Sequence, residues 1–288
     1  MAVLTSQQIS SLAVGLLTRD LILPGTVSRV PGAEFAGSNG DTITVRVPQP
    51  GSSRTQATPG ATITYDDVNE VGVNVTLSHL YHGKLVSDEE LSMDIENFGV
   101  QVTRVQTAAV ATGAEGLLAA SMNGLASEGD FALTASADDT KATLLEARRL
   151  LSAQNVPAGE RFLAVSPEIA VRLLSVDDFT RVDASGDDSA LRDAMLGRIY
   201  GFTVVESNAL DAGTAVAYHK SGFVFANRVP VAPRGASESA SATVGGIGLR
   251  HIFQYVPDKL SDASVVSTFA GAAVVDAARV VKLTTATA

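Results

Sequence analysis

The chain has 288 residues, of which 45% are hydrophobic, so it is long enough for one large domain or two modest ones and is not disordered overall. The formal net charge of −10 argues against tight binding of nucleic acid, because neutralising phosphates requires clustered basic residues. The sequence has no cysteine, which excludes disulfides, thiolate catalysis and cysteine-ligated metals.

The first predicted element is an amphipathic helix over residues 5–23 that ends near Pro24-Gly25. Its apolar positions are Ile9, Leu12, Ala13, Leu16 and Leu17. The segment lacks the basic and continuous apolar regions of a secretory signal, and no apolar run in the chain is long enough to predict a transmembrane helix. The helix has no core of its own, so we expect it to pack on another part of the structure.

A long two-stranded ribbon is predicted next. Residues 41–48 alternate as a strand, residues 49–60 are rich in Gly, Ser, Thr and Pro and predict a loop, and alternation resumes over 61–77. The second strand would span roughly 55 Å. Because an isolated hairpin is unstable in water, the ribbon must lie on something, and a neighbouring subunit is one option.

The strongest helix signal lies over residues 87–122. Ser87-Asp88-Glu89-Glu90 forms a capping box, in which the Ser87 hydroxyl and the Glu90 carboxylate each accept from the other residue's backbone N–H. Such a helix would be about 54 Å long. One apolar seam follows the cap, at Leu91, Ile95, Phe98, Val102, Val105 and Ala109.

The remaining pattern alternates short helices and strands. A helix over 144–153, a strand over 161–165 and a helix beginning at Ser166-Pro167, with Ser166 as N-cap, are predicted first. The later predictions are a short helix capped at 187–189 and ended by Gly197, a strand from Ile199 to Val205, a hairpin of 214–219 and 222–227 turning at Lys220–Gly222, a loop over 235–245, and strands over 250–256 and 264–283.

A search for chemistry identifies no catalytic, cofactor-binding or metal-binding residues. Gly245–Gly248 precedes a strand pattern where a phosphate-binding loop would precede a helix. His79 and His82 would point to opposite faces of a strand, so polar residues closing a hairpin explain them better than a metal site. Ser166 lacks the flanking glycines of a nucleophile elbow.

Two passages carry a resemblance to a known family. They are VPAGERFLAVSPEIAVRLL (156–174) and LGRIYGFTVVESNAL (196–210), and the order of elements agrees over nearly the whole chain. The sequence resembles the major capsid, or coat, proteins of tailed bacteriophages with the HK97-like fold, most of all the group of the Salmonella phage coat protein. The resemblance implies an α+β fold with an N-arm, an extended β-hairpin loop, a peripheral domain with a long spine helix, and an axial α/β domain.

The resemblance also implies domain boundaries. Residues 1–40 would be the N-terminal arm and 41–78 the extended loop that lies across a neighbouring subunit. Residues 79–140 and 255–288 would form the peripheral domain with spine helix 87–122, and 141–254 the axial domain. The chain leaves no room for a large inserted domain.

The function implied is that of a non-enzymatic structural protein that self-assembles into an icosahedral shell around phage double-stranded DNA. Some relatives join subunits by a Lys–Asn bond from the extended loop, but residues 46–75 contain no lysine, so no such cross-link is expected. We expect the subunit contacts to include Arg54, Gln56, Asp66 and Asp67 in the loop and the acidic Asp88, Glu89 and Asp94.

The expected partners are other copies of the chain in pentamers and hexamers, a separate scaffolding protein, a portal and a decoration protein. DNA would be enclosed without specific binding, and no cofactor or membrane is implied. The location would be the virion capsid, assembled in the host bacterial cytoplasm. Three alternatives stay open: an encapsulin-like nanocompartment shell, a soluble α/β enzyme with an unrecognised site, and a phage tail or decoration protein.

Overall fold

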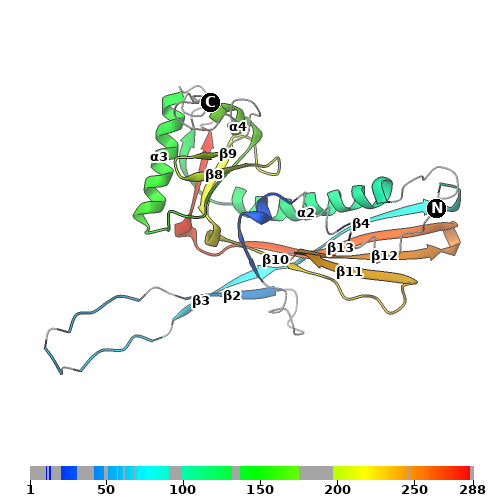
Figure 1. Ribbon diagram of the computed structural model, residues 1–288, viewed down its shortest axis with the longest axis horizontal. Coiled ribbons are helices and arrows are strands. Elements are labelled where there is room, and N and C mark those ends of the chain that lie inside the picture. The colour runs from blue at the N-terminus through cyan, green and yellow to red at the C-terminus, as the bar shows by residue number, and fades with distance from the viewer. Residues whose placement is uncertain are drawn as a thin grey trace.

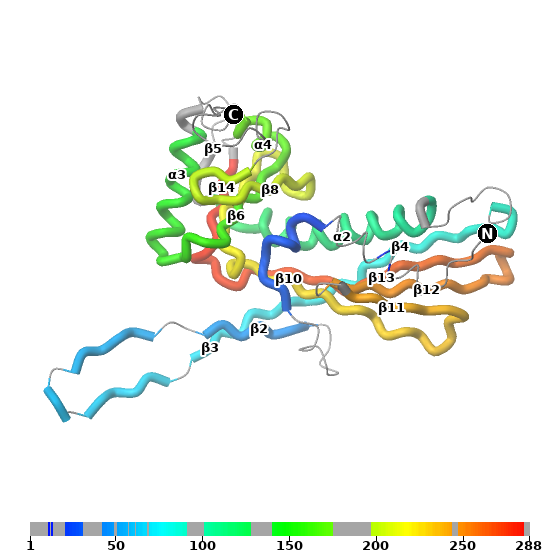
Figure 2. Tube along the Cα trace, in the orientation of Figure 1, coloured from blue at the N-terminus to red at the C-terminus, as the bar shows by residue number. Residues whose placement is uncertain are grey.

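The computed structural model describes Ser11, Ala13 and residues 21–30, 42–48, 51–56, 58–60, 62–67, 69–90, 99–131, 137–174, 197–244 and 247–285. Three parts are visible: a long sheet with a helix along one face, a compact α/β unit, and a narrow ribbon that projects beyond the body (Figure 1). The tube in Figure 2 follows the chain between them. The predicted helix over 5–23 lies mostly outside the described residues, although Ala13 is helical and fully buried.

The long sheet has six strands: β1 (Ser28–Val30), β4 (Ser78–Ser87), β10 (Phe223–Arg228), β11 (Glu238–Val244), β12 (Ile247–Val256) and β13 (Ser261–Val274). β13 pairs antiparallel with β4 on one side and with β12 and β10 in succession on the other. β11 pairs with β12, and β1 pairs in parallel with β10. The predicted loop over 235–245 is therefore wrong for most of its length, because Ser and Ala in β11 are held in strand geometry by β12.

The predicted capping box is confirmed. The backbone N of Ser87 donates to Glu90 Oε2 at 2.9 Å, and the backbone N of Glu90 donates to Ser87 Oγ at 3.2 Å. The pKa of Glu90 is lowered, first by the Ser87 backbone N–H and then by the Ser87 hydroxyl, which donates to the same carboxylate oxygen at 3.0 Å. Further along, a π-helix, η4 (Gly99–Thr103), leads into helix α2 (Arg104–Asn123), which lies on one face of the long sheet (Figure 1).

The predicted apolar seam is wrong beyond Val102. Val102 is buried, but Val105 is 55% exposed and Ala109 is also exposed. The buried positions are instead Gln106 and Val110, each one residue later than predicted. A π-helical turn holds more residues than an α-helical turn, so the inward-facing positions after η4 move along the sequence.

The compact unit has a second six-stranded sheet in the order β5-β14-β9-β6-β8-β7. Its strands are β5 (Ser127–Phe131), β6 (Arg161–Val165), β7 (Arg198–Ile199), β8 (Phe202–Glu206), β9 (Thr214–His219) and β14 (Val280–Thr285). Helices α3 (Ala137–Ala153) and α4 (Pro167–Leu174) bury Leu144, Leu151 and Ile169 against one face. The other face contributes Val216 and Tyr218 to a core shared with α2 and the long sheet.

Two of the three local predictions for residues 161–167 of the compact unit agree with the structure. The strand at 161–165 and the helix start at Pro167 are confirmed. Ser166 is fully buried, and its carbonyl accepts the first helical bond from Ala170 at 2.9 Å. Its hydroxyl has no hydrogen-bond partner among the described residues, so the predicted side-chain cap is wrong.

The stretch Gly197–Glu206 is a tight hairpin, where the sequence predicted one continuous strand. Arg198 pairs with Thr203 and Ile199 with Phe202, which leaves Tyr200 and Gly201 as a two-residue turn. Both turn residues have positive φ, 45° and 91°. Positive φ at both positions is typical of the two-residue turns whose twist matches that of the flanking strands, and glycine is favoured there.

The chain crosses between the two sheets at two short 3₁₀ turns that the sequence misassigned. Turn η5 (Lys220–Gly222) leads from β9 to β10, which belong to different sheets, so the predicted hairpin at 214–227 is wrong. Turn η7 (Ala277–Arg279) divides the predicted strand 264–283 into β13 and β14. The predicted grouping of 141–254 in one domain does not match this pairing, because β10–β12 belong to the long sheet and β14 to the compact unit.

Candidate assembly surfaces

The projecting ribbon consists of β2 (Thr42–Pro48) and β3 (Glu70–Thr76), paired antiparallel. The described residues of the predicted strand at 61–67 form no strand, so the ladder is shorter than predicted. Only the root is packed: Val75 is fully buried with Val224. Gly271 of β13 lies against this root, where an added Cβ would overlap the carbonyl oxygen of Thr76 and lie 3.2 Å from Val75 Cγ1.

The outer part of the ribbon is exposed throughout residues 51–56 and 62–67. Tyr65 is 82% and Ile63 is 54% exposed, so no described residue covers these two large apolar side chains. Arg54 forms an ion pair with Asp66 and donates from Nη1 to the Thr64 carbonyl at 3.1 Å, bracing one arm of the ribbon against the other. The predicted contact residues Gln56 and Asp67 are also exposed here.

A second group of the predicted contact residues lies at the opposite end of the molecule, where β4 ends (Figure 1). Asp88 and Glu89 are exposed, whereas Asp94 lies outside the described residues. Tyr255 donates its hydroxyl to Asp88 Oδ2 at 3.0 Å, and this bond raises the pKa of the Tyr255 phenol. The pKa of Asp262 is also raised, first by burial and then by the Asp88 charge.

Apolar side chains continue along the same end on the face of β4 that points away from α2. Tyr81 is 69% and Leu85 is 43% exposed, while the alternate residues Leu80 and Val86 are partly or fully buried. His79 packs on Phe269 with ring centroids 4.6 Å apart, and His82 lies on the other face beside Val266. The two histidines thus lie on opposite faces, as predicted from strand geometry.

The structure brings together only part of the predicted contact set. Arg54 contacts Asp66, but the loop group and the Asp88 group lie at opposite ends of the molecule (Figure 1). Sequence reasoning missed Tyr255 and Asp262, which join Asp88 from strands distant in sequence. The one signal for them is an acidic and aromatic cluster around Pro257, which marks a turn.

The described residues offer little for catalysis. They contain no group of three or more His, Asp or Glu side chains placed to hold a metal ion. A surface cavity of about 510 Å³ lies beside α2 and is lined by Ile22, Glu115, Glu206 and Ser207, of which Glu115 accepts from Ser207 Oγ at 2.7 Å. Among the residues that the structure describes, no helix is both long and apolar enough to cross a membrane.

The molecule thus has two exposed surfaces at opposite ends: the outer part of the β2–β3 ribbon and the region where β4 ends (Figure 1). Both are available for contact with another copy of the chain. The sequence matches the family model described as phage capsid protein over residues 95–286, more than half of its length. The chain therefore belongs to the phage capsid protein family, whose members are structural proteins of the virion. No curated protein matches the sequence.

Solved structures agree with this fold. A chain of Mycobacterium phage Che8 is 23% identical, with a TM-score of 0.65 over 91% of this chain and 90% of that one. The mature capsid of bacteriophage PhiM1 gives 14% identity and a TM-score of 0.62 over 93% and 88%. A virus-like particle from Pyrococcus furiosus gives 14% identity and a TM-score of 0.57 over 96% and 97%. The predicted HK97-like α+β fold is confirmed.

Proposed function

We propose that this chain is a major capsid protein that self-assembles into an icosahedral shell enclosing phage double-stranded DNA. The observation that carries the proposal is the projecting ribbon, whose Ile63 and Tyr65 are exposed and are not covered by the residues that the structure describes. Burying such apolar surface on another copy supplies a driving force for assembly. A shell holds each subunit by several contacts at once, so individually weak contacts suffice.

In this proposal the ribbon is the extended loop, and it lies across a neighbouring subunit. Its Arg54, Gln56, Asp66 and Asp67 then meet the far end of that subunit, where Asp88, Glu89 and Asp94 supply negative charge. Because the two groups lie at opposite ends of one molecule, a contact between them has to join two copies of the chain. Arg54 is already paired with Asp66, so a neighbouring carboxylate would extend that pair into a network.

The strand pairing supports a proposed division of domain roles. The long sheet with α2 takes the role of the peripheral domain and α2 that of the spine helix, while the compact unit takes the role of the axial domain at the symmetry axes. The boundaries that fit the pairing assign residues 223–274 to the peripheral part and residues 280–285 to the axial part.

The shell would be held without a Lys–Asn bond. Lysine is absent from 46–75, and the nearest lysine, Lys84, lies in β4 of the long sheet rather than in the ribbon. Boiled, assembled shells should therefore run as monomers on a denaturing gel; a ladder of covalent oligomers would contradict the proposal.

The finer features of this proposal come from the sequence resemblance. They are a place near the Salmonella phage coat protein group, a scaffolding protein, a portal and decoration protein as partners, assembly in the host cytoplasm, and the lack of any enzymatic activity. The net charge of −10 suits a shell that confines DNA without adhering to it.

The decisive experiment is to express the full chain with and without its neighbouring genes and to examine the product by sedimentation and electron microscopy. Closed shells are expected, and a monomer under every condition would refute the proposal. An encapsulin-like compartment is the second candidate, favoured by the fold match to the Pyrococcus furiosus virus-like particle. Shells that recruit cargo proteins and lack a portal would support that candidate.

Charge reversal at the loop tests the contact. Arg54→Glu should reduce shell yield, and Arg54→Glu with Asp66→Arg should not restore it, because the double variant rebuilds the ion pair only within the chain. Arg54→Glu with Glu89→Arg should restore part of the yield. Arg46→Glu is the matched control, since Arg46 has its own exposed partner, Glu70, at 3.4 Å. Normal yield from Arg54→Glu alone would refute this contact.

A further inference from the structure

The two 3₁₀ turns that carry the chain between the sheets lie against each other and share one polar network. The backbone N of Val275 donates to the carbonyl of Gly222 at 2.8 Å, and that of Asp276 donates to the same oxygen at 3.3 Å. At Gly222 a Cβ would lie 2.8 Å from a methyl carbon of Val280, so the turns are in close contact. Besides α2, these turns are the described connections between the long sheet and the compact unit.

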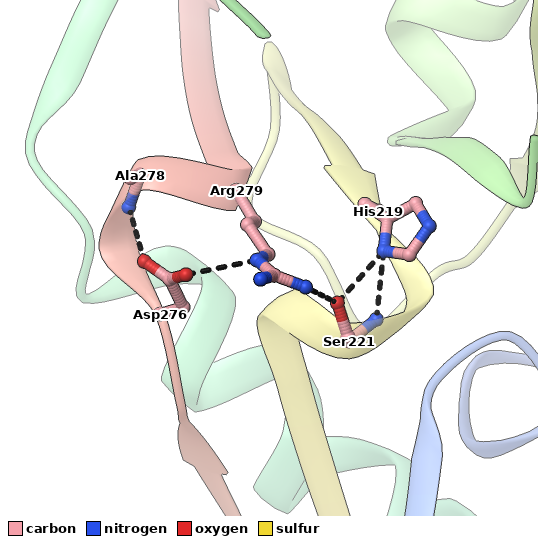
Figure 3. A network of polar contacts seen from close by, with 5 residues as sticks. All are labelled: His219, Ser221, Asp276, Ala278 and Arg279. Atoms are coloured by element: carbon pink, nitrogen blue, oxygen red, sulfur yellow. Dashed lines mark hydrogen bonds and ion pairs between the residues drawn. The ribbon is translucent and has the colours of Figure 1, made fainter. Parts of the chain in front are cut away.

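Ser221 is at the centre of the network in Figure 3. Arg279 Nη1 donates to Ser221 Oγ at 2.5 Å, and a guanidinium can only donate. The Ser221 hydroxyl lies 2.8 Å from His219 Nδ1, and its hydrogen is free to point at that nitrogen because Arg279 occupies only a lone pair. Asp276 holds Arg279 in place, accepting from Nε at 2.8 Å, and also caps η7 by accepting from the backbone N of Ala278 at 3.0 Å.

The backbone fixes which nitrogen of His219 carries the proton. The backbone N of Ser221 donates to His219 Nδ1 at 3.2 Å, so this nitrogen accepts two hydrogen bonds and has no proton. The neutral ring therefore carries its hydrogen on Nε2. Protonation of Nδ1 would set its N–H against the Ser221 backbone N–H and would remove the side-chain cap of η5, while the Ser221 hydroxyl would have to turn and accept.

Charged groups surround the ring on several elements. Arg279 on η7, Arg161 on β6 and Lys220 on η5 disfavour an imidazolium, and Glu160 favours it. Burial and then Arg279 lower the pKa of His219. A depressed histidine pKa means that the neutral ring contributes stability above the unfolded-state pKa, near 6.5, and that this contribution is lost as the pH falls through the folded-state pKa.

We propose that the two turns form an acid-sensitive joint between the long sheet and the compact unit, held closed by neutral His219 and loosened when Nδ1 is protonated. The joint is a property of the single subunit. Its use in the shell, where it would let the compact unit adjust its angle to five-fold and six-fold surroundings, rests on the proposed function.

Hydrogen–deuterium exchange on unassembled full-length subunits tests the joint independently of shell formation. The variant His219→Asn keeps a side-chain acceptor for the Ser221 N–H but does not titrate. At pH 7.5 the backbone amides of residues 220–222 and 275–280 should exchange at similar rates in wild type and variant. As the pH falls through the titration of His219, these amides should come to exchange faster in wild type than in the variant, by up to about tenfold, the effect of losing one hydrogen bond. A wild-type to variant ratio that is constant with pH would overturn the proposal.

A second measurement covers the case in which His219→Asn fails to fold. In wild type, the ring titration of His219 followed by NMR should share its midpoint with the rise in Ser221 amide exchange. The exposed His79 is the control, and the variant His79→Asn should leave both transitions unchanged. Titration of His219 without a change in Ser221 exchange would overturn the proposal.

Discussion

Gly271 lies where the ribbon leaves the body, so a single added methyl group there tests whether ribbon placement governs assembly. Gly271→Ala would drive a Cβ into the carbonyl oxygen of Thr76, with the Thr76 carbonyl carbon at 3.1 Å and Val75 Cγ1 at 3.2 Å. Because carbon and oxygen normally stay about 3.3 Å apart, β3 would have to move by roughly 1 Å. Gly271 does not have positive φ, so the effect would come from crowding alone.

Overpacking of this kind costs about 1–3 kcal/mol of unfolding free energy. Each kcal/mol corresponds to a fall of about 2–4 °C in Tm for a chain of this size. Thermal unfolding of unassembled subunits measures this loss of stability, and sedimentation measures shell yield. We expect yield to fall further than stability alone explains, because a shift at the root is magnified at the far end of the ribbon.

The matched control is Gly116→Ala in α2, where an added Cβ meets no atom within 4 Å. This variant should be more stable than wild type by up to about 1 kcal/mol, since alanine has the better helix propensity, and it should assemble normally. If Gly271→Ala has wild-type Tm and shell yield, the close approach of β3 to β13 is not a constraint and the reasoning fails.

Three further predictions concern the body of the subunit. Leu118→Ala removes a fully buried side chain between α2 and the long sheet and should lower the unfolding free energy by about 2–5 kcal/mol in denaturant titrations; a loss below about 1 kcal/mol would contradict the packing. Burial lowers the pKa of His251 to about 4, so wild type should lose roughly 3 kcal/mol relative to His251→Gln between pH 6.5 and 4, and parallel stability curves for the two proteins would refute this. Ser87→Ala removes a helix cap and should lower Tm by a few degrees in thermal scans, whereas Ser87→Asp should retain most of it.

The sequence predicted elements well where the signal was local. The capping box at Ser87, the strand at 161–165 and the ribbon strand at 42–48 depend on residues within a few positions of one another, and the structure confirms them. The sequence motifs at 156–174 and 196–210, together with the order of the predicted elements, also indicated the capsid family and its fold. Family resemblance succeeded here because the element order is kept over nearly the whole chain.

The errors arose where distant residues decide the outcome. The Ser and Ala run at 238–244 reads as a loop and becomes β11 because β12 supplies its hydrogen bonds. The seam of the long helix slips by one residue after η4, and Gln106 is buried because its amide donates to the Ser264 carbonyl at 2.7 Å. A polar side chain with a buried partner is invisible to an apolar periodicity.

The sequence by itself determined that this is a capsid-family subunit with an extended ribbon, a capping box at Ser87 and a helix further along, because periodicity, capping and short sequence motifs are each read within one stretch of chain. Only the tertiary structure decided that Lys220–Gly222 and 277–279 are crossings between two sheets and not turns within one. The reason is physical: β9 and β10 each bury all or nearly all of their residues, so both read as core strands, and which sheet receives each is set by β13 and β14, far along the chain. That choice also brings His219, Ser221 and Arg279 together.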